Sequence, residues 1–551
     1  MTNAALRGKP DAGNPHARFE EGDSAQAEPR RSALLHKICA VCILAMSALA
    51  AVVSCAAGDL GFVKADRAGA TYYPGECAAF AVPTNAVRWQ VRDMDDAVVG
   101  EGAVDGATRL VLDEKAVGGR FGAFALDVSV AGGATNRTWF ARLTSREVKT
   151  CPWVGTCCHF FTDTNRPLIA DMVAAAGIGI VRTGPSWHGC EQKRGVYAPP
   201  AGFDEFVDGL LAQGVRMNLG LYYGNGIYEN SLDPEAFARF AAWAATHYKG
   251  RIDRFEIWNE PANFFFRKAY WKKGESELVW IEKFIELTQK ADDAIRAVNP
   301  DAIVGVTSED HPTFLWTMLA KGIARSHNAV AFHPYCHAQH RPEREFFLSD
   351  FGASHRALAL AHGGANRWTI TEAGWTTYDG EGEFWKVAGF YPRASYAGQA
   401  SCVVRMYLAA LEAGCDYACQ YDFRNDGFKK SHAEHNFGLV HADYTPKPAY
   451  AAVAFMTRHV GQRRYVCDLS AEKERYRVAL FDPKLGGNDG RILVLWSIEG
   501  ECEWEVPASC GKWVECRDLV GNVIEPPVVS GRRLKLTERP VYLKFEAPHG
   551  K

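Results

Sequence analysis

The central part of the chain alternates short apolar runs with longer amphipathic runs. Short apolar runs between turn residues are typical of buried strands, whereas apolar residues spaced three and four apart predict helices. The expected strands are Trp153–Cys158, Ile178–Thr183, Arg216–Leu221, Arg254–Trp258, Ala302–Thr307, Ala329–His333, Arg367–Thr371 and Tyr417–Tyr421. The expected helices are 166–176, 203–213, 234–248, 278–298, 313–324, 355–362, 395–413 and 446–460. This succession of strand and helix units predicts a (β/α)8 barrel over residues 149–460.

On both sides of the predicted barrel, apolar residues recur at every second position. Phe124, Leu126 and Val128 alternate with small or polar residues, which indicates a strand with one buried face. Residues 491–496 and 541–545 form similar runs near the C-terminus. We therefore expect an α/β protein in which a TIM barrel is flanked by an N-terminal β-sandwich at 59–148 and a C-terminal β-sandwich at 461–551.

The first 58 residues have the layout of an export signal. Basic residues at positions 30, 31, 36 and 37 precede an apolar run over 38–53. That run has about 16 residues, fewer than the roughly 20 that a spanning helix needs, although an uncleaved membrane anchor is the alternative. The sequence Val52-Val53-Ser54-Cys55 resembles a bacterial lipobox. We expect an exported protein that is periplasmic, secreted or attached to the membrane through a lipidated Cys55.

Composition and charge narrow the class of protein. Apolar residues make up 47% of the chain, which is ordinary for a globular protein and excludes disorder or a fibre. The 62 Lys and Arg against 65 Asp and Glu leave no positive excess for a nucleic-acid partner. Phosphate-binding loops and cofactor motifs are not evident. Cys502, Cys510 and Cys516 lie close enough in sequence for one disulfide bridge.

Histidines at 333, 337 and 340 have a spacing that metal sites use on helices. Pro334 follows a predicted strand there and argues against a helix. We therefore expect neither a metal nor a cofactor.

Two glutamates follow strands of the predicted barrel. Glu260 comes after the fourth strand, in Trp258-Asn259-Glu260-Pro261, and Glu372 comes after the seventh. Active sites of such barrels lie at the carboxyl ends of the strands. Carboxylates from strands four and seven face each other across the mouth and could approach to about 5–5.5 Å, the separation of a retaining glycosidase. The pattern therefore favours glycoside hydrolysis over a structural role for either residue.

With these motifs the chain resembles the retaining glycoside hydrolases of clan A, which carry Asn-Glu-Pro after strand four and a second Glu after strand seven. Its C-terminal β segment is similar to that of the xylosidase and iduronidase relatives in family thirty-nine. The resemblance implies that Glu260 is the general acid/base and Glu372 the nucleophile. It also implies that Asn259 bonds the sugar 2-hydroxyl, and that the substrates are β-glycosides or α-L-arabinosides in an oligosaccharide or polysaccharide.

The remaining candidates follow barrel strands and offer polar groups or flat rings for a sugar. Arg182 and Tyr335 would keep the nucleophile ionised, and His159 corresponds in position to a sugar-contacting residue of the clan. The other predicted substrate contacts are Trp187, His188, Tyr222, His333, Trp375, Tyr421 and Asp422. A non-catalytic carbohydrate-binding protein on a hydrolase-like barrel is the main alternative, and a metal-dependent barrel hydrolase ranks last.

Overall fold

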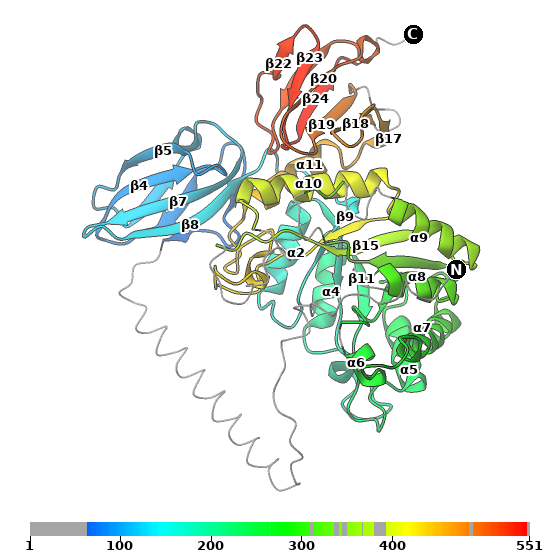
Figure 1. Cartoon of the computed structure of the whole chain (residues 1–551). Coiled ribbons are helices and arrows are strands. Elements are labelled where there is room, and N and C mark those ends of the chain that lie inside the picture. Colours follow the sequence, from blue (N-terminus) through cyan, green and yellow to red (C-terminus); the bar gives the residue numbers. More distant parts are fainter. Residues whose placement is uncertain are drawn as a thin grey trace.

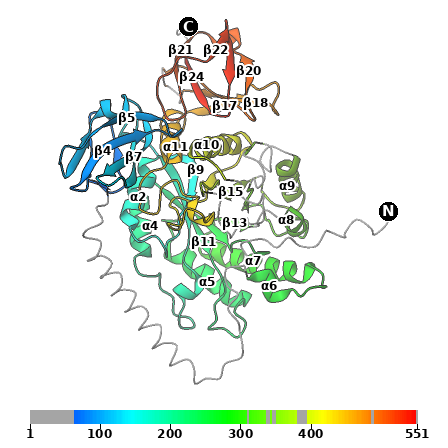
Figure 2. The same cartoon turned by 60° about the vertical axis from the view of Figure 1, so that its left-hand side comes forward.

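The computed structural model describes residues 63–547, apart from 264, 308–311, 336–340, 344–349, 366, 380–392, 484–486 and 488. Three bodies are visible in Figure 1: an N-terminal β domain in blue, a central barrel from cyan to yellow, and a C-terminal β domain in orange and red. The view turned by 60° in Figure 2 shows α10 and α11 between the barrel and the C-terminal domain. The predicted export segment at 1–58 lies outside the described residues.

The N-terminal domain consists of two β-sheets that enclose their own core. Its strands are β1 (Lys64–Ala65), β2 (Thr71–Tyr72), β3 (Ala78–Ala81), β4 (Ala86–Arg92), β5 (Val98–Ala103), β6 (Arg109–Leu112), β7 (Gly122–Val130) and β8 (Thr135–Arg142). One sheet has the order β1-β3-β6 and the other β2-β8-β7-β4-β5. Phe80 of the first sheet packs edge-on against Phe140 of the second. Leu126 and Val128 are fully buried there, as their period of two predicts.

The barrel closes through eight parallel strands in chain order. They are β9 (Cys151–Cys157), β10 (Ile178–Thr183), β11 (Arg216–Leu221), β12 (Arg254–Ile257), β13 (Ile303–Thr307), β14 (Asn328–Phe332), β15 (Trp368–Ala373) and β16 (Ala418–Gln420). The helices that follow them are α2 (Arg166–Ala175), α4 (Phe203–Ala212), α5 (Pro234–His247), α7 (Leu278–Val298), α8 (Pro312–Ala320), α9 (Asp350–Ala361), α10 (Tyr396–Glu412) and α11 (Pro448–His459). Short helices α3 (Trp187–Cys190) and α6 (Phe266–Tyr270) lie in the loops after β10 and β12.

Most of the expected strand boundaries differ from the structure by one or two residues. One difference affects the site: β15 continues to Ala373, so that Glu372 lies inside the strand rather than after it. β16 is shorter than expected and ends at Gln420. Hydrogen bonding to neighbouring strands determines where a strand ends, and a sequence pattern does not contain that information.

The C-terminal domain also has two antiparallel sheets, ordered β17-β18-β19-β24-β21 and β20-β23-β22. Its strands are β17 (Arg464–Asp468), β18 (Tyr476–Asp482), β19 (Ile492–Ser497), β20 (Cys502–Glu505), β21 (Trp513–Arg517), β22 (Val528–Ser530), β23 (Arg533–Leu536) and β24 (Val541–Phe545). Cys502, Cys510 and Cys516 all carry free thiols. None of the three forms the bridge that their sequence spacing would allow. Cys502 and Cys516 are buried in the core of this domain, where a thiol serves as a small apolar group.

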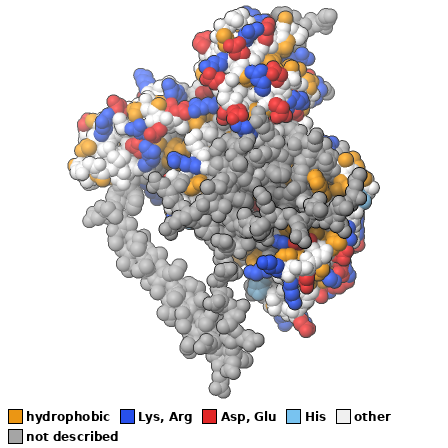
Figure 3. Space-filling model, in the orientation of Figure 1, with side chains coloured by type: hydrophobic (Ala, Val, Ile, Leu, Met, Phe, Trp, Pro, Cys, Tyr) orange, Lys and Arg blue, Asp and Glu red, His pale blue; other side chains and the backbone are white. Residues whose placement is uncertain are grey.

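On the face of the molecule shown in Figure 3, acidic and basic side chains are interspersed over both β domains. Such a surface offers no field of one sign for a polyanion. None of the helices between residues 63 and 547 that the structure describes has both the length and the apolar character of a membrane span.

A buried ion pair joins the barrel to the C-terminal domain. Glu343, from the segment between β14 and α9, accepts hydrogen bonds of 2.6 and 2.7 Å from Arg405 of α10. Trp496 of β19 donates its indole N–H to the same carboxylate at 2.6 Å, and Arg405 also donates to the carbonyl of Ile498. Because these groups are excluded from water, each charge depends on the other for its stabilisation.

We expect Arg405→Met to destabilise the protein by about 3–5 kcal/mol, because the change leaves the Glu343 carboxylate buried without its cation. The midpoint of urea unfolding, compared with that of the unchanged chain, measures the effect. Arg464→Met is the matched control, since Arg464 pairs with Asp482 at the surface and exposed pairs contribute about 0–1 kcal/mol. Equal midpoints for the two variants would contradict the prediction.

Candidate active site

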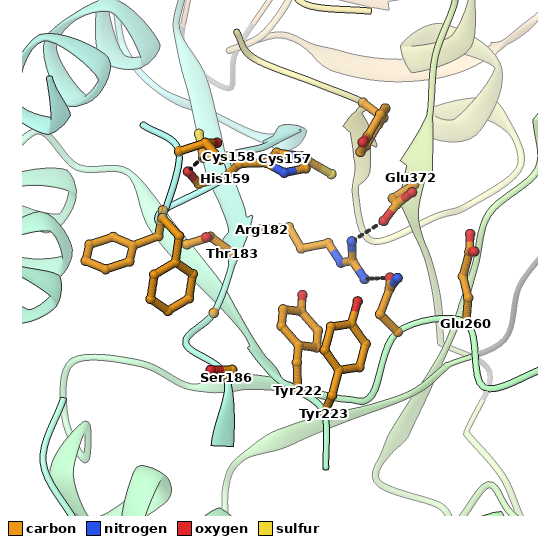
Figure 4. A pocket seen from close by; sticks show the side chains of 16 residues that line it. Cys157, Cys158, His159, Arg182, Thr183, Ser186, Tyr222, Tyr223, Glu260 and Glu372 are labelled. Atoms are coloured by element: carbon orange, nitrogen blue, oxygen red, sulfur yellow. Dashed lines mark hydrogen bonds and ion pairs between the residues drawn. The ribbon is translucent and has the colours of Figure 1, made fainter. Parts of the chain in front are cut away.

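A cavity of about 490 Å³ opens at the carboxyl ends of the barrel strands. Side chains from β10, from β15 and from the loop after β12 converge on it. Figure 4 shows Arg182 at its centre, between Glu372 and the rings of Tyr222 and Tyr223. Phe160 and Phe161 also line the cavity, and their rings pack edge to face. The volume is in the range of small-molecule sites in proteins, and its place in the fold is where barrel enzymes carry their active sites.

Arg182 holds the charged groups of the cavity together. Its guanidinium donates two hydrogen bonds to Glu256, at 2.7 and 3.0 Å, one to Glu372 Oε1 at 2.5 Å and one to Asn259 Oδ1 at 2.7 Å. Burial raises the pKa of Glu256, but the charge of Arg182 and its hydrogen bonds outweigh that effect and leave the pKa below its usual value. Asn218 Nδ2 also donates to Glu256 at 2.8 Å. Glu256 therefore serves as a fixed anion that orients Arg182 toward Glu372.

His333 and Tyr335, both after β14, contact the two glutamates. His333 Nδ1 lies 2.7 Å from Glu260 Oε1 and 3.6 Å from Glu372 Oε2. Its Nε2 lies 3.1 Å from the hydroxyl of Thr371. Tyr335 donates its hydroxyl to Glu372 Oε2 at 3.0 Å. Glu372 thus accepts hydrogen bonds on both oxygens, from Arg182 and from Tyr335.

The two glutamates approach each other closely. One carboxylate oxygen of Glu260, one of Glu372 and one ring nitrogen of His333 all lie within 4.8 Å of one another. Carboxyl groups of inverting glycosidases are about 6.5–9.5 Å apart, since a water must fit between them, whereas those of retaining enzymes are about 5–5.5 Å apart. The nearest oxygens of Glu260 and Glu372 are closer together than the carboxyl groups of inverting enzymes.

The backbone of the β12 loop brings Glu260 into place. β12 ends at Ile257, and both Trp258 and Glu260 then adopt positive φ angles, of 69° and 44°. Such angles are uncommon for residues other than glycine and concentrate at functional sites. The indole of Trp258 is fully buried and packs edge-on against Phe266, which holds this turn in place. Asn263 Nδ2 lies 3.2 Å from Glu260 Oε2 and orients the carboxyl further.

The structure brings together nine of the residues that the sequence predicts for the site. His159, Arg182, Tyr222, Asn259, Glu260, Glu372 and Tyr421 line the cavity, and His333 and Tyr335 contact its glutamates. His188 and Trp375 do not line the described cavity. His188 lies at the surface beside Asn225, and Trp375 is buried. Asp422 is buried next to Tyr421. His337 and His340 lie outside the described residues.

Trp187 does not lie at the mouth of the barrel, where the sequence predicts a substrate contact. Its side chain is fully buried, its ring packs against Phe237 and Phe240 of α5, and its Nε1–H donates to Glu191 at 2.6 Å. A position shortly after a barrel strand predicted a ring at the mouth, but α3 folds back and places this ring in the core. Glu191 also accepts from the hydroxyl of Tyr228 and from the backbone of Gly195. Glu191 therefore stabilises the conformation of this loop.

Sequence reasoning missed several residues of the site. Glu256 is the most important, because it carries two of the hydrogen bonds of Arg182. The sequence contains a signal for it, because Glu256 is an acidic residue within an apolar barrel strand, and a buried carboxylate has to be paired. Tyr223 and Ser186 line the cavity as well. Neither stands in a pattern that distinguishes it from an ordinary loop residue.

Two groups of side chains in the described part of the chain could hold a metal ion by geometry. The first is Glu260, His333 and Glu372, in which the ring nitrogen of His333 already contacts a glutamate oxygen. The second is His159, Asp422 and Asp426, beside the cavity.

His333 provides a pH-dependent contribution to stability. Burial lowers the pKa of its imidazole, but the charge of Glu372 and the hydrogen bond with Glu260 raise it more, so the pKa lies above the usual 6.5. The folded state then binds more protons than the unfolded state between pH 6.5 and the raised pKa, so that this contribution decreases as pH rises. We expect His333→Asn to lower the thermal midpoint most near pH 6 and progressively less toward pH 9.

The same midpoints measured for His362→Asn serve as the control, because His362 lies exposed after α9. A loss in His333→Asn that stays constant or grows with pH would contradict the assignment of a positive charge to this imidazole.

No protein-family model matches the chain, and no curated protein matches it in sequence. The solved structure of a family 39 glycoside hydrolase from the gut symbiont Bacteroides cellulosilyticus WH2 is similar to 88% of this chain and to 100% of its own, with a TM-score of 0.69 and 20% identity. A glucosidase from Croceicoccus marinus is similar at a TM-score of 0.49 and 11% identity, over 73% of this chain and 96% of its own. That second likeness is too distant to support an inference. The first confirms the predicted fold, a (β/α)8 barrel with two flanking β domains, as that of a family 39 glycoside hydrolase structure.

Proposed function

We infer that the protein is a retaining glycoside hydrolase with Glu372 as nucleophile and Glu260 as general acid/base. The observation that carries this inference is the approach of the two carboxylates to within 4.8 Å at the carboxyl ends of β12 and β15. Their surroundings differ in the way that the two roles require. Glu372 accepts hydrogen bonds from Arg182 and Tyr335. Glu260 contacts the imidazole of His333, so that a proton can be shared between the Glu260 carboxyl and this ring.

The reaction proceeds in two steps. Glu372 attacks the anomeric carbon while Glu260 donates its proton to the departing glycosidic oxygen, so that a glycosyl ester forms on Glu372 and the leaving group departs as an alcohol. In the second step, Glu260 takes a proton from water, which attacks the same carbon and releases Glu372. Arg182 and Tyr335 stabilise the carboxylate of Glu372 as it leaves. Asn259, oriented by Arg182, is placed to bond the sugar 2-hydroxyl.

The cavity favours a neutral sugar. Among its described lining residues Arg182 is the one Arg or Lys side chain, and its donors already serve Glu256, Glu372 and Asn259. A sugar carboxylate would therefore lie beside Glu260 and Glu372, while Arg182 is already paired with Glu256 and Glu372. Aromatic rings at Tyr222, Tyr223 and Phe161 provide faces for a pyranose or furanose ring. The proposed substrates are β-glycosides or α-L-arabinosides without a uronate at the cleavage site, in an oligosaccharide or polysaccharide.

We also propose that residues 1–58 direct export and that Cys55 attaches the mature chain to the membrane through lipid. The segment supports this proposal because basic residues precede an apolar run in it. Expression of the full chain and of Cys55→Ser in a bacterium, followed by fractionation, tests it. Transfer of the protein from the membrane fraction to the soluble exported fraction in the variant is expected.

Proton NMR of the first sugar released from an aryl glycoside tests the proposed mechanism. Two inversions at one carbon give net retention, so the anomer observed before mutarotation should have the configuration of the substrate. A screen of aryl β-xyloside, β-glucoside, β-galactoside, β-mannoside, α-L-arabinoside and β-glucuronide identifies the sugar. The opposite anomer would disprove the pairing of Glu260 with Glu372. Binding of sugars without hydrolysis of any substrate would favour the non-catalytic alternative.

A further inference from the structure

A second cluster of ionisable groups lies where the first and last strands of the barrel meet. His159 follows β9, and Asp422 and Asp426 follow β16. One potential ligand atom of each of the three lies within 4.8 Å of the other two. His159 Nε2 is 4.0 Å from Asp422 Oδ2, and His159 Nδ1 is 3.9 Å from Asp426 Oδ1. In Figure 4, His159 lies on the side of the cavity away from Glu260. His159, Asp422 and Asp426 form a group distinct from that of Glu260, His333 and Glu372.

Asp422 is the unusual member of the cluster. Only 1% of it is exposed, and neither of its carboxylate oxygens has a hydrogen-bond partner. A carboxyl that is removed from water without a partner is strongly destabilising.

The cations around Asp422 are directed elsewhere. Lys447 donates its ammonium protons to the hydroxyl of Thr377 and to the carbonyl of Asn436, at 3.1 and 2.8 Å. Arg424 donates its Nε–H to Asp163 at 2.7 Å. Neither side chain forms a hydrogen bond with Asp422, so the carboxyl has no hydrogen-bonded cation.

The separations in the cluster fit a bound ion. At 4.0 Å, His159 and Asp422 are too far apart for a direct hydrogen bond, which needs about 2.7–3.2 Å. Two ligands that each lie about 2.1–2.4 Å from one cation are roughly 3–4.8 Å apart. One imidazole nitrogen with two carboxylates is a donor set that suits a first-row transition metal better than Ca²⁺ or Mg²⁺, which prefer oxygen alone.

We propose that His159, Asp422 and Asp426 bind one divalent transition-metal cation at the seam between β9 and β16. The ion compensates the two carboxylates and ties together the loops after these strands, one of which carries Tyr421 into the cavity. His159 lines the cavity and Asp426 is partly exposed, so an ion can enter from that side. The site has a structural role, differs from the expectation of no metal, and does not depend on the proposed hydrolysis.

The test uses the full chain freed of metal with EDTA, with Zn²⁺ and Mn²⁺ as probes and Ca²⁺ and Mg²⁺ for comparison. We expect one equivalent of Zn²⁺ per chain after gel filtration, measured by elemental analysis, and a rise of about 2–5 °C in the thermal midpoint at saturation. Asp426→Asn should bind Zn²⁺ at least tenfold more weakly. Because Asp426 is partly exposed, this variant should fold even if Asp422→Asn does not.

Glu372→Gln is the matched control, since it alters the other group of potential ligands, with Glu260 and His333, and leaves the seam intact. It should bind Zn²⁺ as the unchanged chain does. The proposal is overturned if the unchanged chain retains no stoichiometric metal, or if Glu372→Gln loses the ion while Asp426→Asn keeps it.

Discussion

Replacing Glu372 by alanine is expected to abolish turnover while the fold survives. Without this carboxylate no glycosyl ester can form, and removal of a catalytic nucleophile reduces kcat by about 10⁴-fold or more. The variant also removes an acceptor of Arg182, but Glu256 and Asn259 continue to hold the guanidinium, so the thermal midpoint should change little. Hydrolysis of the best aryl glycoside and the far-ultraviolet circular dichroism spectrum provide the two measurements.

Labelling identifies the nucleophile directly. A 2-fluoro sugar with an activated leaving group forms a stable ester on the attacking carboxylate, and peptide mapping should find it on Glu372. Glu205→Ala, a change of an exposed glutamate on α4, is the control and should keep full activity and labelling. A label on another carboxylate would refute the assignment of Glu372.

Replacing Glu260 by alanine should affect substrates according to their leaving groups. Glycosides with poor leaving groups need protonation and should lose about 10²–10⁴-fold in kcat, whereas activated aryl glycosides should lose far less in the first step. Added azide should restore turnover, because a small anion can attack the glycosyl ester without a general base. The product is then the glycosyl azide with the configuration of the substrate.

The unchanged chain assayed with azide is the control for this rescue, and it should form no glycosyl azide with a poor leaving group. Equal losses for both classes of substrate, together with the absence of azide product, would remove Glu260 from the acid/base role. His333, which contacts Glu260, would then be the next candidate for the proton donor.

The repeated change from apolar runs to amphipathic runs was enough to predict the barrel. β10, β11 and α7 have the bounds that the pattern predicts. The reason is physical: strands of a closed parallel barrel are buried on both faces, and helices around it bury one side only, so each element carries its own local signature. Glu260 and Glu372 could be selected for the same reason, because each interrupts or ends such an apolar run. Their roles remain predictions until the variants are measured.

Only the tertiary structure decided which polar and aromatic residues meet. Arg182 and Glu256 are 74 positions apart in sequence, and their pairing depends on β10 and β12 facing the same interior. Trp187 is a core residue because Phe237 and Phe240 lie against it, although its place after a strand resembles that of a mouth residue. Periodicity along a chain reports whether a side chain is buried, but its partner in space depends on long-range packing, which no local pattern contains.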